Sequence, residues 1–164
     1  MNRISIITAS NGENLKLAHK FREELENNNQ QCEVFDLVDI DLPMFTPKRK
    51  SEEGVPAEVA ELLEKFKDSK SFVFVAPEYN GGIPPVLTNL FSWISISTKD
   101  WREAFNEKKA VMATHSGSGG INLFASLRIQ LAYIGIDVVG RQIHTHYKKS
   151  LNTESLTAVC KRLV

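Results

Sequence analysis

Short, unbroken apolar runs alternate along the chain with longer segments in which apolar residues recur every three or four positions. The first pattern is typical of strands buried on both faces, and the second is typical of amphipathic helices. The apolar runs predict five strands, at residues 4–9, 33–37, 72–76, 109–114 and 137–144. The three- or four-residue spacing predicts five helices, at residues 15–25, 55–66, 87–94, 123–134 and 152–163.

The alternation of strand and helix predicts an α/β fold, with a parallel sheet covered by helices on both faces. No linker, internal repeat or low-complexity segment divides the sequence, so we expect residues 1–164 to form one domain. Residues 39–54 have a loop-like composition with two prolines and a basic run, Lys48-Arg49-Lys50. This run is typical of a solvated loop.

The strand at Phe72–Ala76 ends at Pro77, which cannot donate a hydrogen bond to a neighbouring strand. The loop that follows is polar and contains Gly81 and Gly82, which allow positive φ or a close approach of the main chain to a ligand. In open parallel sheets, ligands bind beyond the carboxyl ends of the strands. We therefore expect a binding site at this loop.

Two other predicted strands also end in small polar loops. Ser10 to Asn14 separates the first strand from a helix, and free N–H groups at a helix N-terminus are suited to holding a phosphate. This loop lacks the Gly-Lys-Ser/Thr of a Walker A motif and the repeated glycines of a dinucleotide fingerprint. Polar residues before a helix also serve as simple caps. The third loop, His115 to Gly120, follows the fourth predicted strand.

Composition narrows the classes of function. Twenty basic residues balance twenty acidic ones, so no basic excess indicates a nucleic-acid or anionic-membrane partner. No apolar stretch is long enough to cross a bilayer, and the N-terminus lacks the apolar region of a signal peptide. We expect a cytoplasmic protein. Cys32 and Cys160 are interpreted as reduced thiols, and His144-x-His146 as a solvated strand end rather than a metal site.

The third-strand loop also carries a family resemblance. Pro77-Glu78-Tyr79-Asn80-Gly81-Gly82-Ile83-Pro84, followed by Leu87, Asn89 and Trp93, resembles the signature of the NADPH-dependent FMN reductase family. The resemblance implies a flavodoxin-like three-layer sandwich, with a five-stranded parallel sheet in the order 2-1-3-4-5. It also implies FMN as cofactor and NADPH or NADH as co-substrate. The electron acceptor would be a small molecule, such as a flavin, quinone, azo compound or metal oxyanion.

The resemblance places the cofactor on the three loops. The residues expected to bind it are Ser10, Asn11, Glu13, Asn14, Leu15, Pro77, Glu78, Tyr79, Asn80, Gly81, His115, Ser116, Gly117, Gly119 and Gly120. Many family members have a longer first loop with an arginine and a second serine, so the individual phosphate contacts stay open. The flavin supplies the reactivity, so no residue is nominated as catalytic. Glu78 is interpreted as part of an ion pair or a subunit contact, and His115 as a loop-shaping residue.

Three alternatives remain at this point. A flavodoxin-like electron carrier would share the fold, although such carriers are typically strongly acidic and this chain has a net charge of zero. The basic run at 48–50 could instead meet the extra phosphate of NADPH.

The helix at 87–94 predicts a homodimer or homotetramer, because Trp93 and Ile96 point away from its core face. In the other interpretation, Trp93 packs within one subunit under the segment that carries Trp101.

Overall fold

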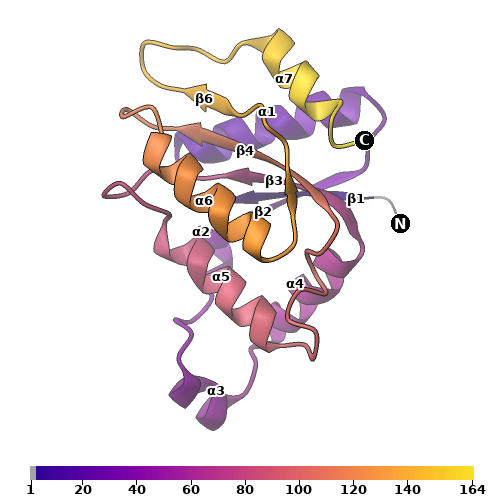
Figure 1. Cartoon of the computed structure of the whole chain (residues 1–164), viewed down its shortest axis with the longest axis vertical. Coiled ribbons are helices and arrows are strands. Elements are labelled where there is room, and N and C mark those ends of the chain that lie inside the picture. Colours follow the sequence, from indigo (N-terminus) through magenta and orange to yellow (C-terminus); the bar gives the residue numbers. More distant parts are fainter. Residues whose placement is uncertain (1–2) are drawn as a thin grey trace.

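The computed structural model describes residues 3–164. Its core is a sheet of strands of different lengths, in which every pairing between strands is parallel. The sheet order is β2-β1-β3-β4-β5, with β6 also paired to β4 (Figure 1). This order confirms the flavodoxin-like sheet expected from the sequence. The strands are β1 (Arg3–Thr8), β2 (Cys32–Asp36), β3 (Ser69–Val75), β4 (Lys109–His115), β5 (Asp137–Val138) and β6 (Ile143–Thr145).

The fifth predicted strand is split into two. β5 pairs with the beginning of β4, where Lys109 lies opposite Asp137, and β6 pairs with its end, where His115 lies opposite Thr145. Residues 139–142 interrupt the strand. The Arg128 guanidinium donates to the carbonyls of Val138 and Val139 at the interruption, at 3.2 and 3.3 Å. A continuous strand over residues 137–144 is therefore wrong in detail, although both halves lie beside β4.

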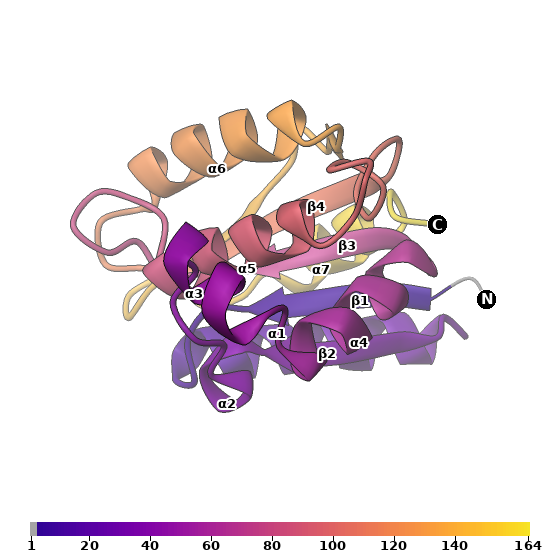
Figure 2. The same cartoon turned by 90° about the horizontal axis from the view of Figure 1, so that it is seen from below.

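Helices cover both faces of the sheet and complete a three-layer sandwich (Figures 1 and 2). One apolar cluster joins the sheet to α1 and α7, and a second joins its other face to α4, α5 and α6. The helices are α1 (Glu13–Asn27), α2 (Leu37–Ile40), α3 (Pro47–Glu53), α4 (Ala57–Lys67), α5 (Pro85–Ile96), α6 (Ile121–Tyr133) and α7 (Thr153–Cys160). None of these helices is both long and apolar enough to cross a bilayer.

The apolar run in β3 lies at the centre of the sheet, as its unbroken apolarity predicts. Phe72 to Ala76 are all fully buried. The Phe72 ring packs against Phe66 of α4 and against Phe105, with ring centroids 5.7 and 5.5 Å apart. Edge-to-face and tilted aromatic pairs of this kind add stability beyond the area they bury. Phe72 and Phe74 belong to the apolar cluster on this face of the sheet, and Val73 and Val75 belong to the cluster on the other, so β3 is packed on both faces.

The segment at residues 39–54 is more ordered than its composition indicates. It contains α2 and α3, and α3 lies at the outer end of the molecule in Figure 1. The Thr46 hydroxyl accepts from the Arg49 N–H at 3.0 Å, and Pro47 occupies the first helical position. Threonine at the N-cap followed by proline is a helix start signal, so the sequence does contain a signal for this helix. The basic run at 48–50 is helical and not a solvated loop.

Trp93 is fully buried, so the expectation that it faces a partner subunit is wrong. Its indole N–H donates to the Pro43 carbonyl at 2.7 Å, and its ring packs edge-on against Phe45. The segment that covers Trp93 is thus the 42–45 chain, and not the segment that carries Trp101. Ile96, on the same helix, also packs against the core. The surface of α5 consequently offers no unpartnered tryptophan.

Candidate functional site

Three loops leave the carboxyl ends of β1, β3 and β4, on one edge of the sheet (Figure 1). They comprise residues 9–12, 76–84 and 116–120. Because β1, β3 and β4 are neighbours and parallel, the polar residues that follow each strand come together there. All the residues expected to bind a cofactor lie on these loops or on the adjoining ends of β4 and α1.

The first loop leads into α1 without a side-chain cap. Gly12 stands at the N-cap, and no side chain accepts a hydrogen bond from the first turn among the residues described. The Thr8 hydroxyl donates to the Ser10 carbonyl at 3.0 Å and fixes the exit of β1. Glu13 pairs with Lys16 at 2.6 Å, and this contact lowers the pKa of the Glu13 carboxyl. The N–H groups of the first turn stay available to an anion.

Asn14 has a different role from the one expected of a phosphate ligand. Its side chain is almost fully buried and forms two hydrogen bonds to the main chain of His115. The His115 N–H donates to Asn14 Oδ1 at 2.7 Å, and Asn14 Nδ2 donates to the His115 carbonyl at 3.2 Å. This amide therefore joins the first loop to the end of β4, and only its main-chain N–H faces the helix end.

The loop after β3 contains a tight hairpin. Tyr79 and Gly82 exchange two main-chain hydrogen bonds, at 3.2 and 2.9 Å, around Asn80 and Gly81. Asn80 and Gly81 both have positive φ, 50° and 71°, as a type I′ turn requires. Within residues 3–164 the N–H groups of these two residues have no acceptor. The Tyr79 side chain is half exposed and presents an aromatic face beside them.

Glu78 links the second loop to the third. Its Oε1 accepts from the Ser118 hydroxyl at 2.7 Å, and its Oε2 accepts from the Leu123 N–H in the first turn of α6 at 3.0 Å. The hydrogen bond from the Leu123 N–H and that from Ser118 lower the pKa of the Glu78 carboxyl. The ion pair expected for Glu78 is absent from the described residues, because the carboxylate instead binds a helix N-terminus.

The loop after β4 is held by its own polar contacts. His115 Nδ1 lies 3.0 Å from the Thr145 hydroxyl, and the Ser116 N–H donates to the Thr145 carbonyl at 3.1 Å. Gly120 has φ 68°, and a Cβ there would lie 2.7 Å from the Thr114 side chain, so only glycine fits. A Cβ at Gly117 would meet no atom within 4 Å, so this glycine borders open space. The start of this loop is therefore joined to β6 through Thr145.

The three helices that follow the loops differ in what their N-termini can bind. The N-terminus of α6 already holds the Glu78 carboxylate. α5 begins at Pro84 and Pro85, which have no N–H to donate. α1 has neither a side-chain cap nor prolines, so its first turn fits a phosphate best of the three. Unpaired N–H groups at Asn80 and Gly81 and the open space at Gly117 suit a flat, carbonyl-bearing ring above the same edge.

Sequence reasoning missed the contribution of β6 to this edge. Thr145 contacts both His115 and Ser116, and His144 Nε2 lies 3.1 Å from the Ser116 carbonyl. No motif marks these residues, since their role depends on β6 pairing beside β4. The His144 and His146 rings stack on each other, and within residues 3–164 no group of three potential ligands could hold a metal ion.

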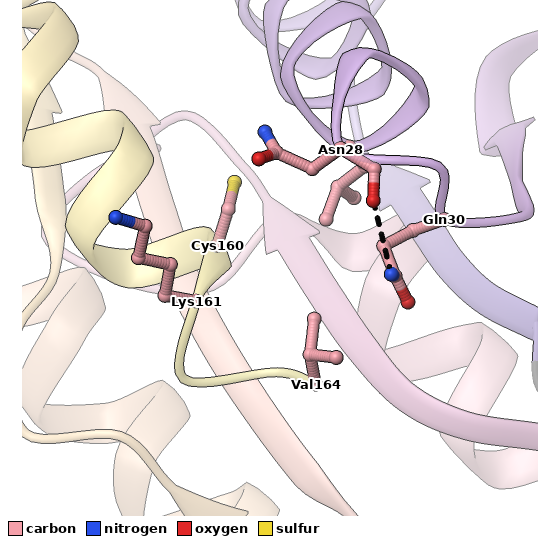
Figure 3. Close-up of a pocket in the computed structure, with 6 residues that line it drawn as sticks. Asn28, Gln30, Cys160, Lys161 and Val164 are labelled. Carbon is pink, nitrogen blue, oxygen red and sulfur yellow. Dashed lines mark hydrogen bonds between the residues drawn. The ribbon is translucent and has the colours of Figure 1, made fainter.

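A pocket of about 350 Å³ lies at the opposite end of the sandwich, between the last turns of α1 and α7 (Figure 3). Its lining comprises Leu25, Asn28, Gln30, Cys160, Lys161 and Val164. Gln30 Nε2 donates to the Asn28 carbonyl at 3.1 Å across its rim. Burial raises the pKa of the Cys160 thiol to about 12. This pocket is remote from the three loops and takes no part in the site.

Comparison with known proteins identifies the class. A family model described as NADPH-dependent FMN reductase matches residues 2–149. The chain therefore belongs to the NADPH-dependent FMN reductase family. It is an FMN-dependent NAD(P)H oxidoreductase with a small-molecule electron acceptor.

Individual relatives and solved structures are similar to this chain at modest sequence identity. The quinone reductase of Escherichia coli K12 is 38% identical over 55 residues, which cover 34% of this chain and 29% of that protein. The structure of FerB, a flavoenzyme NAD(P)H:(acceptor) oxidoreductase from Paracoccus denitrificans, has a TM-score of 0.78 at 18% identity and covers 99% of this chain and 95% of its own. An FMN-dependent NADH-azoreductase from Bacillus anthracis in complex with FMN has a TM-score of 0.65 at 20% identity, over 99% and 96% of the two chains.

Proposed function

We propose that the three loops at the carboxyl edge of the sheet bind FMN. The uncapped first turn of α1 would hold the phosphate, with N–H groups from Glu13, Asn14 and Leu15 and polar groups from Ser10 and Asn11. One observation carries this assignment: no side chain caps the first turn of α1, where the Glu13 carboxylate pairs with Lys16, whereas the Glu78 carboxylate accepts from an N–H in the first turn of α6. The isoalloxazine would lie along Pro77–Gly81 and under Ser116–Gly120, where unpaired N–H groups and open space occur together.

When bound, FMN accepts a hydride from the nicotinamide and passes electrons to the acceptor. The chain's own residues would bind the flavin and orient it toward the nicotinamide. Asn80 and Gly81 offer N–H donors, Tyr79 offers an aromatic face, and Gly117 and Gly119 leave room for a second ring. Glu78 and Asn14 fix the loops relative to one another. No side chain is assigned a proton-transfer role, since the chemistry belongs to the cofactor.

The acceptor is proposed to be a flavin, quinone, azo compound or metal oxyanion. We place the protein in the cytoplasm, where nicotinamide dinucleotides are available and where its two unpaired cysteines, Cys32 and Cys160, stay reduced. One continuous sheet runs through the described residues, which supports residues 1–164 acting as one domain.

We also propose a homodimer, able to pair further into a homotetramer, built on α6 instead of α5. The helix carries a second apolar stripe, with Ile121, Ile129 and Tyr133 exposed by 74%, 73% and 68%. At about 100° per residue, this stripe points away from the core residues of the same helix. Trp101 packs on Tyr133 with ring centroids 5.4 Å apart and extends the stripe. Contiguous exposed apolar surface of this kind typically marks a partner site.

The test is a visible spectrum of the purified protein, followed by anaerobic addition of NADPH or NADH. The proposal expects a flavin spectrum that either nicotinamide bleaches rapidly without any protein partner. A flavin spectrum that neither nicotinamide alters would favour the electron-carrier alternative. A protein that stays colourless in excess FMN would overturn the site itself.

A further inference from the structure

His115 carries an unsatisfied ring nitrogen. Its main chain is fixed by Asn14, and its Nδ1 lies 3.0 Å from the Thr145 hydroxyl. Tyr147 packs edge-on against the ring, with centroids 5.4 Å apart. Nε2 is buried and has no hydrogen-bond partner among residues 3–164. A buried polar atom without a partner costs free energy, and such atoms indicate a missing ligand or a functional role.

His115 is also one of the residues that line a pocket of about 220 Å³. This pocket lies on the flank of α1, between that helix, β6 and the chain that leads to α7. Its lining comprises Glu13, Lys16, Leu17, Lys20, His115, Thr145, His146, Lys149, Ser150 and Leu151. The pocket therefore extends from Glu13, the first residue of α1, along the flank of that helix to Lys20.

The lining is basic. Three lysines face one carboxylate, so its formal charge is +2 with the histidines neutral. Lys16 is paired with Glu13 within the pocket, and Lys20 with Glu23 on its outer side, at 2.6 and 2.7 Å. Lys149 has no carboxylate partner among the described residues. A positive lining with an unpaired lysine favours a compact anion over a metal cation.

We propose that this pocket binds the phosphate monoester of a nucleotide, held by Lys20, Lys149 and the Ser150 hydroxyl, with His115 Nε2 as a further donor. Nε2 carries the proton in the tautomer in which Nδ1 accepts from the Thr145 hydroxyl, and that hydroxyl then no longer donates to the Thr114 carbonyl, 3.4 Å away. In this tautomer a phosphate oxygen would supply the acceptor that Nε2 lacks, so a bound phosphate would favour it. Lysine is a common point-charge ligand of phosphate, and the serine hydroxyl adds a directional donor.

Two nucleotides could supply the phosphate. The flavin phosphate has a place at the first turn of α1, which leaves this pocket for the 2′-phosphate of NADPH. This assignment rests on the proposed function, because it takes the nicotinamide dinucleotide as the co-substrate. It makes the pocket the element that distinguishes NADPH from NADH.

The experiment follows the ring nitrogens of His115 by ¹⁵N NMR while inorganic phosphate is added to the full-length protein. A saturable shift of the Nε2 resonance is expected. The Lys20→Gln/Lys149→Gln double variant should weaken phosphate binding roughly tenfold. Lys148→Gln is the matched control, since Lys148 is an exposed neighbour that does not line the pocket, and it should leave binding unchanged. An unmoved Nε2 resonance, or equal weakening in the control, would overturn the site.

Competition between nucleotides then identifies which of them supplies the phosphate to this pocket. Adenosine 2′-phosphate should displace inorganic phosphate from the pocket, and adenosine 5′-phosphate should do so much more weakly. Displacement by FMN, with adenosine 2′-phosphate inactive, would overturn the NADPH assignment. Failure of both NADPH and NADH to bleach bound flavin would refute the proposed function alone, because the phosphate titration does not depend on turnover.

Discussion

The Asn14 side chain forms two hydrogen bonds with the main chain of His115, one to its N–H and one to its carbonyl. The two residues are 101 positions apart in sequence, and the pair joins the first loop of the site to the end of β4. Asn14→Ala should lower the free energy of unfolding by about 2–3 kcal/mol, because both main-chain groups of His115 lose their partner. Urea denaturation measures this change.

Asn11→Ala is the matched control for that variant, since Asn11 is exposed and lies on the same loop. It should change the free energy of unfolding by no more than about 0.5 kcal/mol. If Asn14→Ala were as stable as this control, the hydrogen bonds between the two loops would contribute nothing.

Glu78 should make stability depend on pH in the acid range. Its pKa is lowered from the ordinary value of 4.5 by the hydrogen bonds from Leu123 and Ser118, so the unfolded chain binds the proton more readily than the folded one. The contribution is therefore present above pH 4.5 and lost as the pH falls through the folded-state pKa. Unfolding free energies measured down through that range should fall less steeply for Glu78→Gln than for the unaltered protein. Glu58→Gln, an exposed carboxylate on α4, should retain the original slope.

Riboflavin should bind much more weakly than FMN if the first turn of α1 holds the phosphate. FMN at 100 times its dissociation constant should stabilise the fold by about 2.7 kcal/mol. Riboflavin at the same concentration should give a far smaller rise in melting temperature, because it lacks the charged group. Equal stabilisation by the two compounds would place the phosphate away from the protein surface altogether.

Ile129→Lys should convert the proposed dimer into a folded monomer. Ile129 is 73% exposed at the middle of the α6 stripe, so the lysine costs nothing in an isolated subunit but buries a charge in an interface. Multi-angle light scattering at micromolar concentration should report the halved mass. Val55→Lys, at an exposed valine away from α6, should leave the mass unchanged. A monomeric unaltered protein would refute the interface.

Neither cysteine should react readily with a thiol reagent at neutral pH. Burial raises the pKa of the Cys32 thiol to about 11 and that of Cys160 to about 12, so almost no thiolate forms in the folded protein. Modification by a disulfide reagent should be slow and should accelerate strongly once urea unfolds the chain. Rapid labelling of the folded protein at pH 7 would contradict the burial of both groups.

The sequence predicted the parts of the molecule that depend on local pattern. The apolar run of β3 and the three loops beside β1, β3 and β4 follow from periodicity and from proline and glycine positions. The roles of Asn14 and Glu78 did not follow, because their partners, His115 and Leu123, come from other elements and meet them only in the folded chain.

Trp93 illustrates the same limit. Its angle on the helix excludes it from the face that packs on the sheet, and the sequence offered no sign that residues 42–45 would fold back to cover it. The Pro43 carbonyl and the Phe45 ring supply that cover, 50 and 48 residues earlier in the chain. Helical periodicity locates one buried face, and it cannot locate a second one that a distant loop creates.

The hydrogen bonds that join the three loops have a consequence for how tightly and quickly a ligand associates. Asn14 joins the first loop to β4, Glu78 joins the second loop to the third, and Thr145 joins the third loop to β6, in each case through the chain's own hydrogen bonds. A cradle that is already ordered loses little conformational entropy when it is filled. Association should then be limited by encounter rather than by loop rearrangement, and most of the contact energy should appear as affinity.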